Sequence, residues 1–331
     1  MKPFGLKDYH EGFLAEVKPF LEALAQEEPA LFADTLFLSF LGARICYAAT
    51  RPLNLFAERR FRDQEELISF LMRLKASGHA SVFAHSPLVV KKDLSAEARA
   101  RLFPFLFKAW WAGEALCLNL RHFAEAYEDE PFRRLLSASL AASRDWPRFR
   151  AFKIEFSAEG PKASETTLGA LIEGPWPEGE GLWAPREAYV IEVSPEKTAP
   201  FGWLAVIVEG FSRLFSHQFV RHTWLNFNQR SHRYTAVDQF VCPPSFDDEA
   251  RKIYEDQIKE GLSAYEGLVK KGIKKEDARF VTPQGAATTL LATGPRFVWE
   301  DFVAKRNHPK AQWEIRALAA GLALVLKRLN P

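Results

Sequence analysis

The sequence lacks the features that mark secreted, membrane-spanning and strongly charged proteins. Its three cysteines in 331 residues, Cys46, Cys117 and Cys242, are too scattered for a disulfide framework or a metal-binding cluster, and they favour a reducing, cytoplasmic location. No apolar run reaches the ~20 residues that span a bilayer, and the N-terminus lacks the apolar centre of a signal peptide. The net charge of +2 argues against general binding to nucleic acid or to a membrane surface.

The sequence also lacks the glycine-rich fingerprints of common nucleotide-binding loops. Neither GxGxxG nor GxxxxGK[ST] occurs, so the Rossmann and P-loop signatures are excluded. The remaining composition is ordinary for a globular protein, with 47% apolar and 26% charged residues. A chain of this length forms one large domain or two modest ones with a substantial core.

One segment, residues 216–234 (SHQFVRHTWLNFNQRSHRY), crowds cationic and amide side chains together. Between Phe211 and Val237 there is no aspartate or glutamate, but there are four arginines and three histidines: Arg213, Arg221, Arg230, Arg233, His217, His222 and His232. Apolar and aromatic residues are interleaved with them, so the segment is expected to be half buried, and buried arginines need partners. We therefore predict an anion site of the phosphate type, with a solvated basic surface as the alternative.

Part of this segment resembles the signature of a known enzyme family. Residues 221–233, RHTWLNFNQRSHR, are similar to RHRxxSxNxxSxR of the flavin-dependent thymidylate synthases. Two positions depart from the signature, because Thr223 stands at its third arginine and Asn226 at its first serine. The matching positions are Arg221, His222, Asn228, Ser231 and Arg233.

Three further segments resemble the same family, in the family's order along the chain. They are residues 78–85 (GHASVFAH), residues 272–283 (GIKKEDARFVTP) and residues 311–316 (AQWEIR). Upstream of Arg306 the resemblance weakens, because the family's flavin-contacting Asn-x-Arg and its Asn-Phe or His-Phe pair are replaced by Gly294-Pro295-Arg296 and Asp301-Phe302.

About a hundred residues, 91–188, have no counterpart in the family and form an expected insertion, either a lid or an assembly element, within a single domain of residues 1–331. Its first half is helix-like and aromatic, whereas residues 151–186 are rich in Gly, Pro and Glu, which is typical of turns, a hairpin or a mobile loop. Asn119 and Arg121 resemble the family's Asn-x-Arg element, either by chance or as its replacement.

The resemblance implies an enzyme that methylates dUMP to dTMP, with methylenetetrahydrofolate and NADPH as co-substrates and FAD as cofactor, and with neither a cysteine nucleophile nor a metal. It also implies a homotetramer whose sites are built across subunits. By resemblance, the residues expected to bind the nucleotide are Gln218, Arg221, Gln229, Ser231, Arg233, Arg279 and Arg306, and those expected to act in catalysis are Arg221, Gln229, Ser231 and Arg306. The residues expected to bind the flavin or the folate are Cys46, His85, His222, Thr223, Trp224, Asn228, Arg296 and Asp301.

Two other functions are open at this point. One is a diverged homologue that binds a nucleotide, has lost flavin chemistry and serves as a regulatory or structural subunit. The other is a single-strand nucleic-acid binder that uses aromatic stacking and arginines, which steep salt dependence would identify.

Apolar periodicity predicts helices over residues 10–30, 65–77, 201–220 and 248–271, and alternation predicts a strand over residues 189–193. The apolar residues 36–49 are either core or, as the resemblance implies, part of the flavin site. The resemblance implies an α+β fold with an antiparallel-rich central sheet and long packed helices, whereas periodicity alone indicates a mixed, helix-rich protein.

Overall fold

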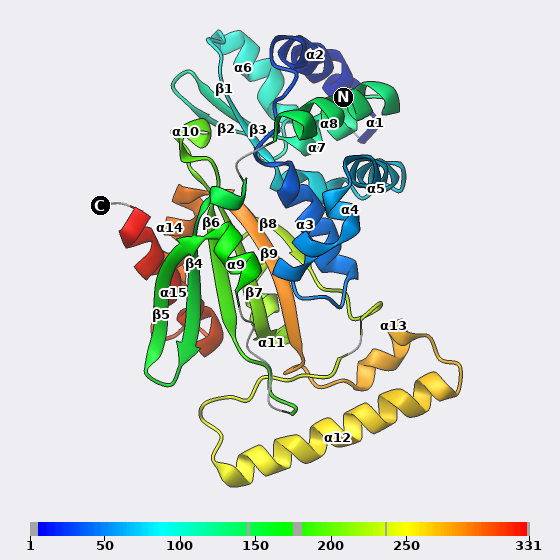
Figure 1. Cartoon of the computed structure of the whole chain (residues 1–331), viewed down its shortest axis with the longest axis vertical. Helices are drawn as coiled ribbons and strands as arrows, with labels where there is room; N and C mark the ends of the chain where they lie inside the picture. Colours follow the sequence, from blue (N-terminus) through cyan, green and yellow to red (C-terminus); the bar gives the residue numbers. More distant parts are fainter. Residues whose placement is uncertain (1–5, 144–145, 175–180, 236, 330–331) are drawn as a thin grey trace, which may run out of the picture.

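A six-stranded sheet lies at the centre of the structure, and every neighbouring pair of its strands is antiparallel (Figure 1). The computed structural model describes residues 6–143, 146–174, 181–235 and 237–329. The strand order is β5-β4-β6-β7-β9-β8. The strands are β4 (Arg150–Ser157), β5 (Gly160–Thr167), β6 (Glu187–Glu192), β7 (Trp203–Ser212), β8 (Asn226–Gln229) and β9 (Ala287–Pro295).

Helices cover both faces of this sheet, so the α+β prediction is confirmed (Figure 1). They are α1 (Leu6–Gly12), α2 (Lys18–Glu27), α3 (Leu36–Tyr47), α4 (Arg59–Arg62), α5 (Gln64–Ala76), α6 (Ala96–Leu102), α7 (Leu120–Ala126), α8 (Asp129–Ala142), α9 (Leu168–Glu173), α10 (Pro195–Thr198), α11 (Arg213–Phe219), α12 (Asp248–Lys270), α13 (Lys275–Ala278), α14 (Arg296–Arg306) and α15 (Trp313–Leu329). Within the described ranges, no helix combines the length and the apolarity that crossing a bilayer requires.

Alternate residues of the central strands pack into two separate cores. Tyr189 and Ile191 of β6 belong to the core shared with α3 and the other N-terminal helices. Val190, between them, belongs to the core shared with α14 and α15. This separation follows from the two-residue period of a strand, which sends successive side chains to opposite faces.

The helix predicted over residues 201–220 is wrong for most of its length. Residues 203–212 form β7, all ten of whose positions are buried, and the helix α11 begins only at Arg213. The Ser212 side chain caps that helix by accepting a hydrogen bond from the Phe215 amide. Because β7 lies between β6 and β9 with helices over both faces, its sequence is apolar without alternation, and such a run fits a helical period equally well.

The other predicted elements are confirmed with small shifts of their ends. The helix predicted over residues 10–30 is α1 and α2 joined by a π-helical turn at Phe13–Val17, and the one over residues 65–77 is α5, which ends before Gly78 in a left-handed conformation (φ +77°). The strand over residues 189–193 belongs to β6. The apolar segment 36–49 is the buried helix α3.

Residues 91–188 contribute to the central sheet as well as to the upper part of the molecule (Figure 1). Their first half is only partly helical, because β2 (Trp110–Ala112) and β3 (Ala115–Asn119) form a three-stranded sheet with β1 (Pro87–Lys91). Their second half contains the hairpin β4–β5, which adds two strands to the central sheet. Part of the expected loop, residues 175–180, lies outside the described residues.

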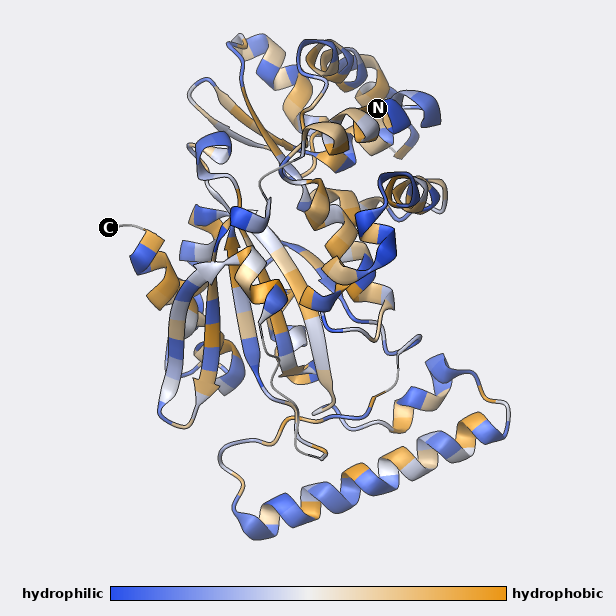
Figure 2. Ribbon diagram, in the orientation of Figure 1, coloured by the Kyte–Doolittle hydropathy of each residue, from blue (hydrophilic) through white to orange (hydrophobic). Residues whose placement is uncertain are grey.

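The long helix α12 lies beside one end of the sheet and is separate from the cores of both faces (Figure 1). Figure 2 shows hydrophobic and hydrophilic residues alternating along it, as the periodicity of residues 248–271 predicts. Asp247 caps its start by accepting a hydrogen bond from the Ala250 amide. The following segment, α13 and the 3-10 turn at Arg279–Val281, leads back to β9.

Candidate functional site

The edge strand β8 divides the signature segment into two parts. Arg221 and His222 precede β8, whereas Ser231 and Arg233 follow it. A strand advances about 3.3 Å per residue, so these two pairs lie beyond opposite ends of β8. The structure therefore brings together only part of the predicted nucleotide-binding set within one copy of the chain.

The second part of the signature lines a cavity of about 520 Å³, which we call the motif cavity. Four predicted site residues line it: Cys46 at the end of α3, Gln229 at the end of β8, and Ser231 and Arg233 after β8. The Ser231 amide donates to the Cys46 carbonyl (2.9 Å), which fixes the chain after β8 against α3. Cavity-lining residues that were not predicted as site residues are Tyr47, Phe70, Arg73, Leu74, Ser77, His79 and Tyr234.

An aromatic cluster borders the motif cavity beside Arg233. The rings of Tyr47 and Tyr234 lie 5.4 Å apart, and those of Tyr47 and His79 lie 5.9 Å apart, both edge to face. The Arg233 guanidinium lies over the Tyr234 ring and pairs with Glu276 of α13 (2.5 Å). The cavity thus joins aromatic surface to a cation, which suits a planar ring that carries an anionic group. The sequence pattern Cys-Tyr at the end of α3 was the available signal for Tyr47.

A buried hydrogen-bond chain connects the central sheet with Cys46. His85 is fully buried, with Nδ1 2.9 Å from Thr293 Oγ1 and Nε2 2.5 Å from Asn228 Oδ1. The Asn228 amide nitrogen donates in turn to Cys46 Sγ (2.9 Å). Burial lowers the pKa of His85 to about 4, so the ring is neutral at pH 7. His85 does not line the motif cavity. Its role there is to position Asn228, which in turn positions Cys46.

Gly42 of α3 leaves the space that the His85 ring occupies. A Cβ at this position would lie 2.7 Å from His85 Cδ2, and the ring cannot retreat because both its nitrogens are hydrogen-bonded. We expect Gly42→Ala to lower the free energy of unfolding by about 1–3 kcal/mol in urea titrations.

The matched control is Gly267→Ala in α12, whose added Cβ would have no neighbour within 4 Å. Alanine is the better helix former by roughly 1 kcal/mol, so this change should leave stability equal or raise it. Equal urea midpoints for the two variants would contradict the packing of His85 against Gly42.

The first part of the signature lies against α14. Arg306 Nε donates to His222 Nε2 (2.8 Å), and the His222 ring packs edge to face on Phe302. Burial, and then the charge of Arg306, lower the pKa of His222 to about 4, so the neutral ring can accept this bond. Arg221 is exposed beside this pair.

Comparison with known proteins finds a family model that matches the C-terminal part of the chain. Residues 195–331 match the model of a family described as thymidylate synthase complementing protein. The match contains β7 to β9, the whole signature segment and both C-terminal helices, so the resemblance predicted from the signature is confirmed.

Relatives of the chain carry the name flavin-dependent thymidylate synthase. The one from Sulfurisphaera tokodaii is 37% identical over 128 residues, which are 38% of this chain and 50% of the relative. The one from Geobacter sulfurreducens is 38% identical over 130 residues (38% and 56%), and the one from Pyrococcus furiosus is 36% identical over 121 residues (34% and 49%). The chain thus spans about half the length of the curated relatives it matches.

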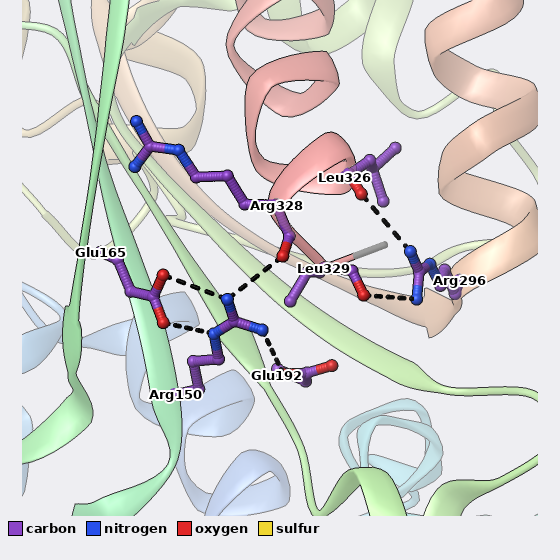
Figure 3. Close-up of polar contacts among 7 residues, drawn as sticks. All are labelled: Arg150, Glu165, Glu192, Arg296, Leu326, Arg328 and Leu329. Atoms are coloured by element: carbon purple, nitrogen blue, oxygen red, sulfur yellow. Dashed lines mark hydrogen bonds and ion pairs between the residues drawn. The ribbon is translucent and has the colours of Figure 1, made fainter. Parts of the chain in front are cut away.

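Two expected cofactor residues on α14, inside the family match, have structural partners instead. Arg296 donates to the carbonyls of Leu326 and Leu329 (3.4 Å each), and Arg150 donates to that of Arg328 (3.2 Å), so two arginines cap the end of α15 (Figure 3). Asp301 pairs with Lys305 one turn later (2.7 Å). Neither residue lines the motif cavity.

The expected cofactor residues Thr223 and Trp224 are both exposed, and residues 108–110, outside the family match, contact Trp224 and its neighbour Leu225. The Trp224 ring lies 5.3 Å from the ring of Trp110 in β2. Lys108 donates to the carbonyl of Leu225, and burial lowers the pKa of Lys108 to about 8. Lys108 and Trp110 therefore hold the turn between α11 and β8 in place.

Asn119 and Arg121 contact residues that lie close to them in the sequence. The side-chain amide of Asn119 donates to the carbonyl of Phe107 (3.2 Å). Arg121 lies over the Phe107 ring and donates to Glu125 (2.6 Å). Neither lines the motif cavity, so the structure gives no support for their replacing the family's flavin contacts.

The other residues expected to bind the nucleotide lie at the two ends of β8. Gln218 is half buried on α11, on the side of Arg221. Gln229 donates to Thr288 Oγ1 (3.1 Å) at the motif cavity. Arg279 donates to the carbonyl of Glu276 (3.1 Å), the residue that also pairs with Arg233. Gln229, Ser231, Arg233 and Arg279 thus form one group, and Gln218, Arg221 and Arg306 form another.

Proposed function

We propose that the chain is a flavin-dependent thymidylate synthase, which methylates dUMP with methylenetetrahydrofolate, FAD and NADPH to give dTMP and tetrahydrofolate. The observation that carries the proposal is the convergence of Gln229, Ser231 and Arg233 with Cys46 on one cavity. Its volume of about 520 Å³ lies within the ~300–1,000 Å³ of ligand pockets. The names of the relatives support the same activity.

In this proposal Arg233 and Ser231 hold the phosphate of dUMP. Arg233 is half exposed, and its present partner Glu276 is partly exposed too, so a dianionic phosphate can displace that carboxylate at little desolvation cost. The Gln229 amide is available to a carbonyl of the uracil ring. The rings of Tyr47, His79 and Tyr234 offer stacking surface to a planar ligand.

A flavin bound beside the nucleotide would supply the hydride that completes the methyl group. The residues of this chain bind and orient the reactants. Burial raises the pKa of the Cys46 thiol, which therefore stays protonated at neutral pH and is a poor nucleophile. That property favours a reaction without a covalent cysteine adduct.

We also propose that a second copy of the chain completes the site. Arg221, Arg306 and Gln218 lie beyond the other end of β8 from the motif cavity, so they would reach a nucleotide bound in a neighbouring subunit. A homotetramer with sites shared between subunits provides this arrangement.

One observation favours the second candidate, a nucleotide-binding homologue without flavin. Arg296 and Asp301 are engaged within the fold, and Trp224 packs on Trp110 of the insertion. Arg296 and Asp301 are then occupied by partners within the fold and Trp224 has a neighbouring ring already, while Ser231 and Arg233 still line the motif cavity.

The visible absorption spectrum of the purified protein, with and without added FAD, tests the proposal. A bound-flavin spectrum that shifts when dUMP is added would support the synthase, because both ligands then share one site. A colourless protein that takes up no FAD yet binds dUMP by calorimetry would support the second candidate. Binding of neither ligand would contradict both.

A further inference from the structure

A second cavity lies behind the segment that follows β8. Side chains of residues 229–233 alternate between two cavities: Gln229, Ser231 and Arg233 line the motif cavity, whereas Arg230 and His232 line a cavity of about 320 Å³. We call the latter the basic cavity. Its other charged lining residues are Arg51, Glu209 and Asp238.

Two more arginines lie beside the basic cavity, at the edge where β7 ends and β9 begins. The Arg213 amide donates to the Ala286 carbonyl, and the His232 ring bonds the backbone of Ala287, so both side chains gather at the start of β9. Arg279, in the turn that leads to β9, acts electrostatically on both of them.

Arg213 lacks a counter-ion in the part of the chain that the structure describes. It is half buried, it makes no side-chain hydrogen bond or ion pair with a described residue, and the charged group acting on it is Arg279, another cation. Arg230 is largely buried as well, and its one side-chain hydrogen bond to a described residue goes to the carbonyl of Thr50 (3.1 Å). Its Nε is buried without a partner. Buried guanidinium groups normally have anionic partners.

Glu209 and Asp238 act electrostatically on Arg230, but neither forms a hydrogen bond or ion pair with it among the described residues. Glu209 Oε1 pairs with Arg51 (3.3 Å). Its Oε2 is buried without a hydrogen-bond partner, so it does not accept from Arg230 Nε, which is equally unsatisfied. Asp238 is exposed.

The electrostatic potential around His232 is positive, as the pKa of this residue indicates. The pKa of His232 is lowered to about 4 by burial and then by Arg213, Arg230 and Arg279. Burial also lowers the pKa of Arg213 and of Arg230, which means that desolvation opposes each charge; Glu209 and Asp238 offset part of this for Arg230, whereas Arg279 adds to it for Arg213.

We propose that the basic cavity binds a phosphate group, held by Arg213 and Arg230, in addition to any phosphate that Arg233 holds in the motif cavity. Phosphate oxygens accept paired N–H bonds from arginine forks, and such charge-assisted bonds would supply the counter-ion that Arg213 lacks and the hydrogen-bond partner that Arg230 Nε lacks. A volume of about 320 Å³ suits a small group rather than a whole dinucleotide. The phosphate comes either from a free anion or from the distal end of a nucleotide that carries more than one phosphate and extends past residues 229–233.

Isothermal titration of the full-length protein with inorganic phosphate, dUMP and dUTP tests the proposal. Inorganic phosphate is titrated in the Arg233→Ala background, so that the motif cavity does not contribute. We expect Arg213→Gln and Arg230→Gln each to raise the Kd for inorganic phosphate about tenfold or more, as loss of a charge-assisted bond predicts. Arg213→Lys, which keeps the charge, should restore part of the affinity.

Arg316→Gln is the matched control, because Arg316 is exposed and bonds only the carbonyl of Pro309 among the described residues. It should leave all three affinities unchanged. Thermal unfolding of each variant identifies any loss of fold, and Arg213→Lys keeps the test decisive if Arg213→Gln unfolds.

The three ligands separate the two sources of the phosphate. A nucleotide source predicts that Arg213→Gln weakens dUTP but not dUMP. A free anion predicts that it weakens inorganic phosphate and leaves both nucleotides unchanged. If neither Arg213→Gln nor Arg230→Gln alters the binding of any of the three, the proposal is overturned. The outcome can be told apart from failure of the synthase proposal, because inorganic phosphate binding in the Arg233→Ala background requires neither flavin nor the motif cavity.

Discussion

Replacing Arg233 with alanine is expected to raise the Kd for dUMP by about 100-fold or more, equivalent to about 2.7 kcal/mol. Arg233 lines the motif cavity beside Ser231, and it is the only arginine of the signature that does so. Loss of its fork removes charge-assisted bonds to a dianionic phosphate, each of which contributes ~1.5–3 kcal/mol. Titration of dUMP into the variant and the unaltered protein measures the change.

The matched control for this experiment is Glu276→Gln, which removes the present partner of Arg233 and leaves the arginine in place. Because dUMP no longer competes with a carboxylate, its affinity should stay equal or rise. Both side chains of the pair are partly exposed, so neither change should alter the unfolding midpoint much. An Arg233→Ala protein that binds dUMP normally would contradict the assignment of the phosphate to the motif cavity.

Acidification from pH 7 towards pH 4 is expected to destabilise the fold by several kcal/mol through two buried histidines. His85 and His122 are fully buried, and burial lowers the pKa of each to about 4, against 6.5 in the unfolded chain. Between these values the unfolded chain binds more protons than the folded one, so stability that is present above pH 6.5 is lost as the pH falls towards 4. Each histidine contributes about 3 kcal/mol to this loss.

Urea unfolding at several pH values between 4.5 and 7.5 measures the effect. His122→Gln should lower stability at pH 7.5, because the His122 ring bonds the Phe107 carbonyl and the Asn119 amide, but it should flatten the dependence on pH. His10→Gln, at an exposed position, should leave that dependence unchanged. A free energy of unfolding that is constant from pH 7.5 to 4.5 would show that these rings are accessible to protons in the folded state.

The sequence by itself predicted the helices whose apolar stripes repeat at a helical period. Residues 65–77 and 248–271 carry such stripes with clear end signals, and both form helices close to the predicted bounds. The sequence also identified the signature segment. Its cationic side chains, the absence of carboxylates near them and the interleaved aromatic residues can all be recognised without tertiary information. The predicted grouping of Gln229, Ser231 and Arg233 follows from their closeness along the chain.

Only the tertiary structure decided where each of these side chains points. The prediction over residues 201–220 failed because a strand buried on both faces has no alternation, and its burial is imposed by β6, β9 and the covering helices. His85 and Arg296 have suitable chemistry for a cofactor site, yet packing commits the first to Asn228 and the second to the end of α15.

The two cavities beside residues 229–233 show the same division. Composition marks the whole segment as basic, but the fold, in which the chain turns after β8, assigns Arg233 to one cavity and Arg230 to the other. The partners that make the cavities, Cys46 from α3 and Glu209 from β7, lie far away in the sequence. Residue types and their spacing are local properties, and they determined that the segment is cationic and suited to an anion. The enclosure of a site depends on contacts between distant segments, so only the fold decided it.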